Sequence, residues 1–465
     1  MNSKNMSEPR AFLSQRTILL NTVQPAILIV ENGKICEIVQ GAGNSEKEYV
    51  VNKYPNIEIE NFGSSILMPG IVDSHVHINE PGRTEWEGFS TATKAAAAGG
   101  VTTIADMPLN SIPPTTTVDN LKVKAKAALG KTYVDVAFWG GVIPGNQKEL
   151  RNMINAGVVG FKCFLCPSGV DEFPHVTAND VVTALQELKS TNSVLAFHAE
   201  CETECETLTG AKGDPELYET FLRSRPDIME NTAIGMVCQW CKESNVRCHI
   251  VHLSAAEALN LVKDAKNSGA QLSAETCYHY LVLSAEEVPK CATEFKCCPP
   301  IRDKNNQEKL WAGLKNGTLD MVVSDHSPCV KELKSSGDFL AAWGGISSLQ
   351  FGLSLLWTAG QKRNLELTEL SMLLSARPAK LCGLDNRKGV LAVGMDADFV
   401  IWDPEASFKI EKDHIYYKNK ITPYEGKSLN GKVLATILRG EYIYKNGEFS
   451  EQPIGNLLLK QDILA

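Results

Sequence analysis

Short apolar runs alternate with helix-compatible segments through the middle of the chain. Strands that alternate with helices predict parallel βαβ units, and eight such units favour an α/β fold with a closed (β/α)8 TIM-like barrel. An open doubly wound sheet is the alternative, but no G-x-G-x-x-G motif follows the first run. The eight candidate strands, rich in β-branched residues, are residues 66–75, 101–107, 134–142, 158–165, 194–200, 246–254, 270–276 and 319–326. Helix-compatible segments between them include 91–98, 118–128, 178–189, 231–243 and 255–266.

The two ends of the chain are β-rich and contain Asn-Gly pairs at 32–33 and 446–447, which predict tight hairpins. Neither end has enough strands for a sandwich of its own. We therefore predict that both ends build one small β-sandwich domain and that the barrel is inserted between them. The expected parts are residues 1–64 for the N-terminal part of the sandwich, 65–385 for the barrel, and 386–465 for the C-terminal part and tail.

Charge and hydropathy limit the kinds of partner. The 465 residues include 46 Lys and Arg against 55 Asp and Glu, a formal net charge of −9, with no basic tract. This composition argues against nucleic-acid binding, which depends on clustered cations. No apolar run approaches the roughly 18–20 residues that span a bilayer, and the N-terminus lacks the apolar core of a secretory signal. We predict a soluble intracellular protein with a small-molecule substrate and no membrane partner.

The sequence leaves more than one cellular compartment open. A cytoplasmic location is the default for a chain with these properties. Lys4, Arg10 and Arg16 in a Ser-containing N-terminus leave a mitochondrial presequence open. A peroxisomal location also stays open, although the C-terminal residues are not the usual peroxisomal tripeptide.

Histidines follow several of the predicted strands. His75 and His77 stand at i and i+2, which places both side chains on one face of an extended segment. His198 and His252 each end a strongly apolar run. Each residue alone has an ordinary structural reading as a polar loop or core histidine. Together, at the carboxyl rim where barrel enzymes gather their catalytic groups, they predict a metal site.

Asp325 and Lys162 add two further candidates. Asp325 follows the apolar run 321–324, where it serves either as a turn or helix cap or as a metal ligand and proton carrier. Lys162 interrupts the apolar run 158–165, where an unpaired ammonium would cost several kcal/mol. Either Lys162 pairs with an acid at the rim, or its neutral amine captures carbon dioxide as a carbamate that bridges two metals.

These residues resemble the cyclic amidohydrolases, the branch of the amidohydrolase superfamily that holds dihydroorotase, hydantoinase and allantoinase. The resemblance runs from Asp-Ser-His-Val-His at 73–77 to Gly-Met-Asp-Ala-Asp at 394–398. Dihydroorotases more usually have Met-Pro-Asn-Thr where this chain has Met-Pro-Leu-Asn at 107–110. The motifs most similar to those of allantoinases are residues 80–88, 106–111, 160–162 and 324–328.

The resemblance implies a ligand set for two divalent metal ions, with zinc as the first expectation. His75, His77 and Asp325 would hold one ion and His198 and His252 the other. The carbamate formed from carbon dioxide on Lys162 would bridge the two ions.

The resemblance also implies the reaction. A hydroxide held between the ions would open the cyclic amide of allantoin to give allantoate, with Asp325 as the catalytic proton carrier. Arg83, Asn110 and Cys298 are the substrate contacts that position in the motifs suggests, and a homo-oligomer, a tetramer in the family, is expected. The alternatives are a hydantoinase (dihydropyrimidinase), a dihydroorotase, or a non-enzymatic assembly relative that keeps the barrel.

Overall fold

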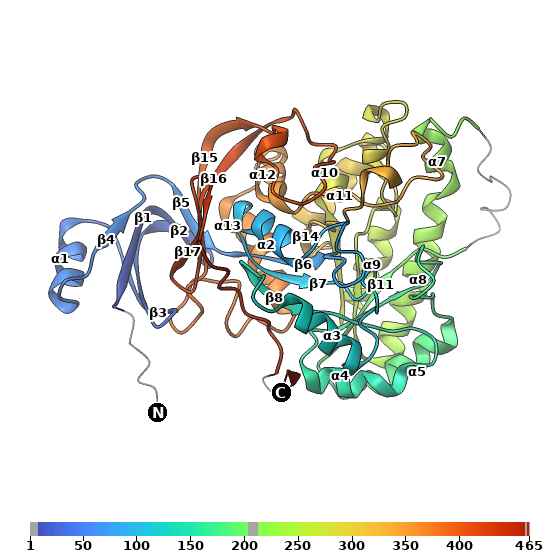
Figure 1. Ribbon diagram of the computed structural model, residues 1–465, viewed down its shortest axis with the longest axis horizontal. Helices are drawn as coiled ribbons and strands as arrows, with labels where there is room; N and C mark the ends of the chain where they lie inside the picture. Colours follow the sequence, from blue (N-terminus) through green and yellow to red (C-terminus); the bar gives the residue numbers. More distant parts are fainter. Residues whose placement is uncertain (1–7, 203–212, 461–462, 465) are drawn as a thin grey trace.

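The computed structural model describes residues 8–202, 213–460 and 463–464. Lys4, one of the basic residues that leave a presequence open, lies outside these residues. The molecule has two parts, a barrel of parallel strands with surrounding helices and a large sheet built from both chain ends (Figure 1). None of the helices in the described part of the chain is long and apolar enough to cross a membrane.

Parallel strands follow one another in chain order around the barrel. Two hydrogen-bonded groups, β6-β7-β8 and β9 to β14, make up its wall. β9 continues β8 after one residue, and Val76 pairs with His326 to join the first strand to the end of the last. The predicted parallel α/β arrangement is confirmed. The strands are β6 (Ile71–Val76), β7 (Val101–Asp106), β8 (Asp135–Phe138), β9 (Gly140–Gly141), β10 (Phe161–Phe164), β11 (Val194–His198), β12 (Arg247–Ile250), β13 (Leu272–Cys277) and β14 (Met321–Val323).

Three of the described helices that connect these strands begin at a side-chain cap. Thr177 forms a capping box with Asp180 at the start of α5, and Thr117 and Asp303 cap α3 and α11. Their apolar faces are buried in the barrel's core. The helices are α2 (Phe89–Ala98), α3 (Val118–Ala128), α4 (Leu150–Ala156), α5 (Ala178–Leu188), α7 (Tyr218–Ser224), α8 (Asp227–Ser244), α9 (Leu259–Asn267), α10 (Tyr278–Val282), α11 (Lys304–Lys315), α12 (Gly352–Gln361), α13 (Leu367–Ser371) and α14 (Arg377–Leu381).

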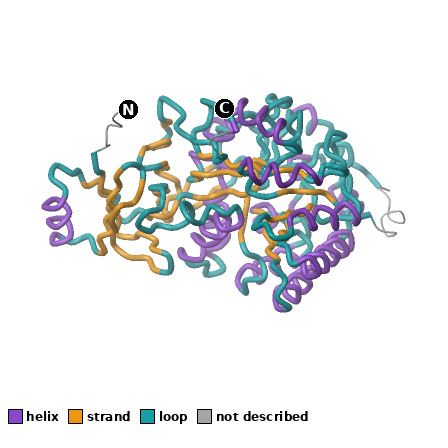
Figure 2. Tube along the Cα trace, turned by 90° about the horizontal axis from the view of Figure 1, so that it is seen from below, coloured by secondary structure: helices purple, strands orange, loops and turns teal. Residues whose placement is uncertain are grey.

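Strands from both chain ends share one nine-stranded sheet in the order β18-β17-β16-β15-β5-β1-β2-β3, with β4 on β1. Alternate residues of β1 enter separate apolar clusters, Phe12 in one and Leu13 in the other. The short helix α1 (Asn44–Lys53) buries Val50 in the second cluster and lies at the far end of the molecule from the barrel (Figure 2). The pairing describes one continuous sheet, and the finer division into a sandwich stays a prediction. The strands are β1 (Arg10–Leu19), β2 (Thr22–Glu31), β3 (Lys34–Gln40), β4 (Ile59–Asn61), β5 (Ile66–Pro69), β15 (Phe399–Lys409), β16 (Ser428–Leu438), β17 (Glu441–Lys445) and β18 (Glu448–Phe449).

The prediction of a single strand over 66–75 is wrong, because Gly70 divides this run between the two sheets. β5 pairs with β1 and β15 in the chain-end sheet, and β6 pairs with β7 in the barrel. A Cβ at Gly70 would lie 2.2 Å from Oγ1 of Thr102, so only glycine fits where the chain crosses. One apolar run therefore ties both parts of the molecule together just before the first histidine pair.

A buried lysine links the barrel to the chain-end sheet. Nζ of Lys388 lies 2.6 Å from Asp135 on β8, 2.9 Å from Asp396 and 2.5 Å from Asp398. Arg439 also donates to Asp135, at 2.6 Å. Because buried charges need partners, this cluster of acids and bases explains why the Asp-Ala-Asp segment stands where the chain returns to the sheet.

Candidate metal centre and substrate cavity

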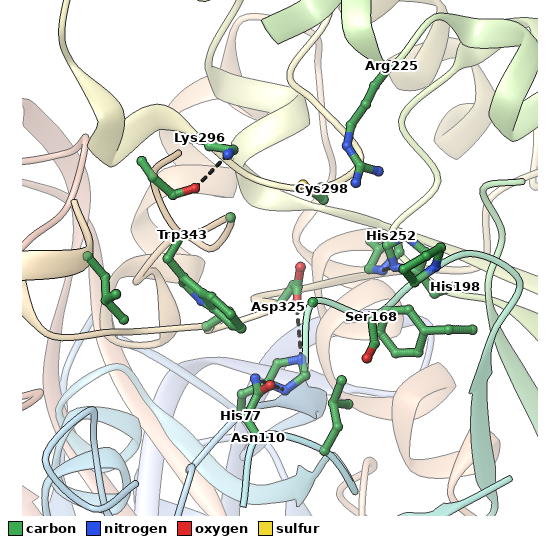
Figure 3. A pocket seen from close by; sticks show the side chains of 18 of the residues that line it. His77, Asn110, Ser168, His198, Arg225, His252, Lys296, Cys298, Asp325 and Trp343 are labelled. Atoms are coloured by element: carbon green, nitrogen blue, oxygen red, sulfur yellow. Dashed lines mark hydrogen bonds and ion pairs between the residues drawn. The ribbon is translucent and has the colours of Figure 1, made fainter. Parts of the chain in front are cut away.

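The six residues predicted as metal ligands converge at the carboxyl ends of the barrel strands. Each is at most 7% exposed. Figure 3 shows four of them, His77, His198, His252 and Asp325, around one cavity. The residues and their positions are His75 on β6 and His77 just after it, Lys162 on β10, His198 at the end of β11, His252 after β12 and Asp325 after β14.

One group of atoms gathers around Asp325. Its Oδ1 lies 3.1 Å from Nε2 of His75 and 3.4 Å from Nε2 of His77. Nζ of Lys162 lies 3.0 Å from the same Nε2 of His75. Burial raises the pKa of Asp325 by itself, but the hydrogen bond from His77 and the nearby charge of Lys162 oppose burial, and this pKa lies below its ordinary value. Asp325 is therefore a carboxylate at neutral pH.

A second group brings His198 and His252 together. Nδ1 of His198 lies 3.0 Å from Nε2 of His252, and each nitrogen has a lone pair when it does not carry a proton. Nδ1 of His252 is buried without a hydrogen-bond partner among the described residues. Burial lowers the pKa of both rings and also of His75 and His77. Four neutral imidazoles facing a carboxylate fit a divalent metal, whose ligands must be deprotonated.

Two carboxylates behind the histidines decide which ring nitrogen faces the cavity. Oε1 of Glu275 lies 2.5 Å from Nδ1 of His75, and Oε2 of Glu200 lies 2.8 Å from Nε2 of His198. These contacts leave Nε2 of His75 facing Lys162 and Asp325, and Nδ1 of His198 facing His252, as in carboxylate-supported metal sites. Sequence reasoning missed both acids, although Glu200 ends one predicted strand and Glu275 lies within another.

Glu275→Gln is expected to lower the affinity of the site for divalent metal by about 10- to 100-fold, because the amide is a weaker acceptor and no longer holds His75 in one tautomer. Titration of metal-free protein with Zn²⁺ measures this change, and circular dichroism checks the fold. Glu257→Gln, at an exposed position, is the matched control. Equal metal affinity in the two variants would contradict a supporting role for Glu275.

The backbone is strained at two of the rim positions. His252 has φ 38° and Asp325 has φ 41°, in the left-handed region that residues with a Cβ rarely occupy. Both residues stand two positions after the end of a barrel strand. Strain of this kind concentrates at functional sites, where the surrounding structure holds it in place.

The cavity above these residues has a volume of about 280 Å³. Asn110 and Cys298, two of the predicted substrate contacts, line it. Asn110 places Nδ2 3.4 Å from Nδ1 of His77, and its buried Oδ1 has no hydrogen-bond partner in the described part of the chain. An unused buried acceptor beside the metal centre indicates a place for an N–H group of a ligand.

The contact of Arg83 with substrate stays a prediction, and the structure places its guanidinium against Glu172. Arg83 is not among the described residues that line the cavity. It donates to the carbonyl oxygen of Asn110 at 2.8 Å and pairs with Glu172. The guanidinium joins two neighbouring loops, because Glu172 follows β10 and Asn110 follows β7, and it supports the backbone of Asn110 from outside the cavity.

Arg225, Lys296 and Trp343 are among the lining residues that were missed from the sequence. Lys296 donates to the carbonyl oxygens of Leu340 and Ala342, which ties the segment before Trp343 to the wall that bears Cys298. The ring of Trp343 lies 4.8 Å from that of Trp86. Neither motif nor periodicity marks these positions, since the connecting loops bring them together.

Comparison with known proteins agrees with this architecture. The profile of the Amidohydrolase family matches residues 66–443. L-hydantoinase (dihydropyrimidinase) from Arthrobacter aurescens superposes with a TM-score of 0.89 and 30% sequence identity, over 97% of this chain and 99% of that one. The chain belongs to the amidohydrolase family.

Sequence similarity is greater to one group of enzymes. The mitochondrial allantoinase of Aquarana catesbeiana is 53% identical over 83% of this chain and 78% of its own length. The allantoinase of Streptomyces avermitilis is 46% identical over 96% of this chain and 98% of its own. The allantoinase of Saccharomyces cerevisiae is 42% identical over 97% and 98%.

Proposed function

We propose that this protein is an allantoinase, which hydrolyses the cyclic amide of allantoin to allantoate. The observation that carries the proposal is the convergence of four neutral histidines, a lysine and a carboxylate around the base of one cavity. The identity of 42–53% to allantoinases over most of the chain supports the choice of substrate.

His75, His77 and Asp325 fit one divalent ion, and His198 and His252 fit a second, with zinc the ion that suits this donor set. Such ions, when bound, polarise a carbonyl group and lower the pKa of water. The chain's own contribution is to hold the ligands in fixed orientation through Glu200 and Glu275.

Lys162 fits the role of a shared ligand once it is carboxylated. Burial lowers its pKa to about 8, which makes the neutral amine accessible near physiological pH. Attack of this amine on carbon dioxide forms one N–C bond and releases one proton. The resulting carbamate places two oxygens where the ammonium would otherwise oppose bound cations.

Asp325 is placed to move the proton. As a carboxylate at the edge of the cavity, it accepts a proton from the attacking water and delivers it to the ring nitrogen that leaves. Oδ1 of Asn110 accepts a hydrogen bond from an N–H group of the ring on the opposite side. The ring opens to a carboxylate and a second ureido group.

A hydantoinase is the alternative that the overall structural similarity favours, because the solved relative with a TM-score of 0.89 carries that name. All these enzymes share the metal chemistry, so rim contacts decide the substrate. A non-enzymatic assembly protein is disfavoured here since none of the predicted ligands is missing, and a bound-metal assay separates it from an enzyme.

The kcat/KM on allantoin is expected to exceed that on dihydroorotate by at least about 10²-fold, because the carboxylate of dihydroorotate would be buried without a free cation to pair with it. Turnover of allantoin, hydantoin and dihydroorotate is measured side by side with metal content. Comparable rates on allantoin and dihydroorotate, or a clear preference for hydantoin, would overturn the assignment and leave the metal centre in place.

A further inference from the structure

Arg225 is the lining residue whose role the proposed reaction leaves open. It follows α7 directly, and its guanidinium points into the cavity from the wall opposite Asn110 and His77 (Figure 3). The side chain is 26% exposed, which makes it partly accessible to a ligand in the cavity. Its backbone is held in place, because Arg302 donates to its carbonyl oxygen.

The charge of Arg225 is balanced inside the protein. Nη1 donates to Oε2 of Glu200 at 2.6 Å, and Glu200 is completely buried. Cys166 and Cys298 are the other ionisable groups close to the guanidinium. The pair formed by Arg225 and Glu200 therefore presents N–H donors to the cavity without a net charge.

The other basic side chains of the cavity are already engaged. Lys162 lies among the metal ligands, and Lys296 donates to two backbone carbonyl oxygens. A guanidinium carries several N–H donors, and only one of them is used by Glu200. Arg225 is thus the basic group on this wall, among the described lining residues, with donors left for a ligand.

We propose that the guanidinium of Arg225 donates to the carbonyl oxygen of the substrate's neutral ureido arm. This contact would select allantoin over rings without that arm. This inference rests on the proposed function and deepens it. A charged donor to a carbonyl oxygen gives a strong hydrogen bond, whereas Glu200 removes the net charge that would favour a carboxylate. Asn110 and Arg225, on opposite walls, would hold the ring and the arm of one ligand.

The test compares allantoin with hydantoin, which has the ring and lacks the arm. In Arg225→Met, the ratio of kcat/KM on allantoin to that on hydantoin is expected to fall by about 10- to 10²-fold, with Arg225→Lys intermediate. The Ki of hydantoin as a competitor of allantoin gives the same comparison if hydantoin is turned over slowly. Metal content is measured in each variant, since Glu200 also supports His198.

Arg83→Gln is the matched control, because Arg83 is an arginine of the same rim that does not line the cavity. Its allantoin-to-hydantoin ratio is expected to stay within about threefold of the wild-type ratio. An equal loss on both substrates in Arg225→Met would show that Arg225 acts only through Glu200 and would overturn the proposal. Absence of allantoin turnover in the wild-type enzyme would instead overturn the proposed function itself.

Glu200→Gln tests the charge balance separately. With the anion removed, the free guanidinium should bind hydantoin-5-acetate, a ring with a carboxylate arm, about tenfold better relative to hydantoin than the wild type does. The Ki values of the two ligands are compared as a ratio. A loss of affinity that affects both ligands equally, through His198, does not change this ratio. An unchanged ratio would overturn the inference that Glu200 tunes Arg225 for a neutral arm.

Discussion

Lys162→Ala is expected to leave a folded protein with little bound metal and negligible turnover of allantoin. The substitution removes the residue that we propose, once carboxylated, as the shared ligand of both ions. It leaves Nε2 of His75 without its contact at 3.0 Å. The fold is expected to survive because the metal centre lies on the rim, whereas the packed core of the barrel lies below it. Metal analysis, turnover and circular dichroism measure the three effects.

Lys334→Ala is the matched control for this experiment. Lys334 is also buried with a pKa lowered to about 8 by burial, but it donates to the carbonyl oxygens of Thr293 and Lys296. Its variant is expected to keep the metal.

Metal-free wild type should also regain activity better with bicarbonate present. Full activity and metal content in Lys162→Ala, or equal recovery in rigorously bicarbonate-free buffer, would contradict the carbamate.

Asp325→Asn is expected to lower turnover by about 10²–10⁴-fold, the usual contribution of a positioned general base, while part of the metal remains. The amide keeps the shape of the side chain and an oxygen toward His75 and His77, but it does not accept a proton at neutral pH. Steady-state kinetics and metal analysis on one preparation separate the two effects.

Asp303→Asn serves as the control for this exchange. Asp303 caps α11 by accepting from the backbone N–H of Asn306, and asparagine caps helices equally well, so its turnover should be unchanged. Near-wild-type rates in Asp325→Asn would show that another group, such as His252, moves the proton.

The local sequence pattern is sufficient to predict much of the barrel and its candidate metal ligands. The helix predicted at 118–128 is α3 with the same bounds, because helical spacing and the Thr117 cap act over a few residues. His75 and His77 share a face for an equally local reason, the two-residue period of an extended segment. The run 66–75 was mispredicted since nothing local distinguishes one buried strand from two that are divided at Gly70.

The sequence by itself determined the kinds of chemical group at the strand ends, the parallel order of the strands and the family to which the chain belongs. Only the tertiary structure decided which groups meet. Glu275 supports His75 from 200 positions away, and Arg225 enters the cavity while Arg83 turns to Glu172. The physical reason is that strand and helix periodicity depend on near neighbours, whereas the pairing of buried charges depends on loops that close only when the barrel forms.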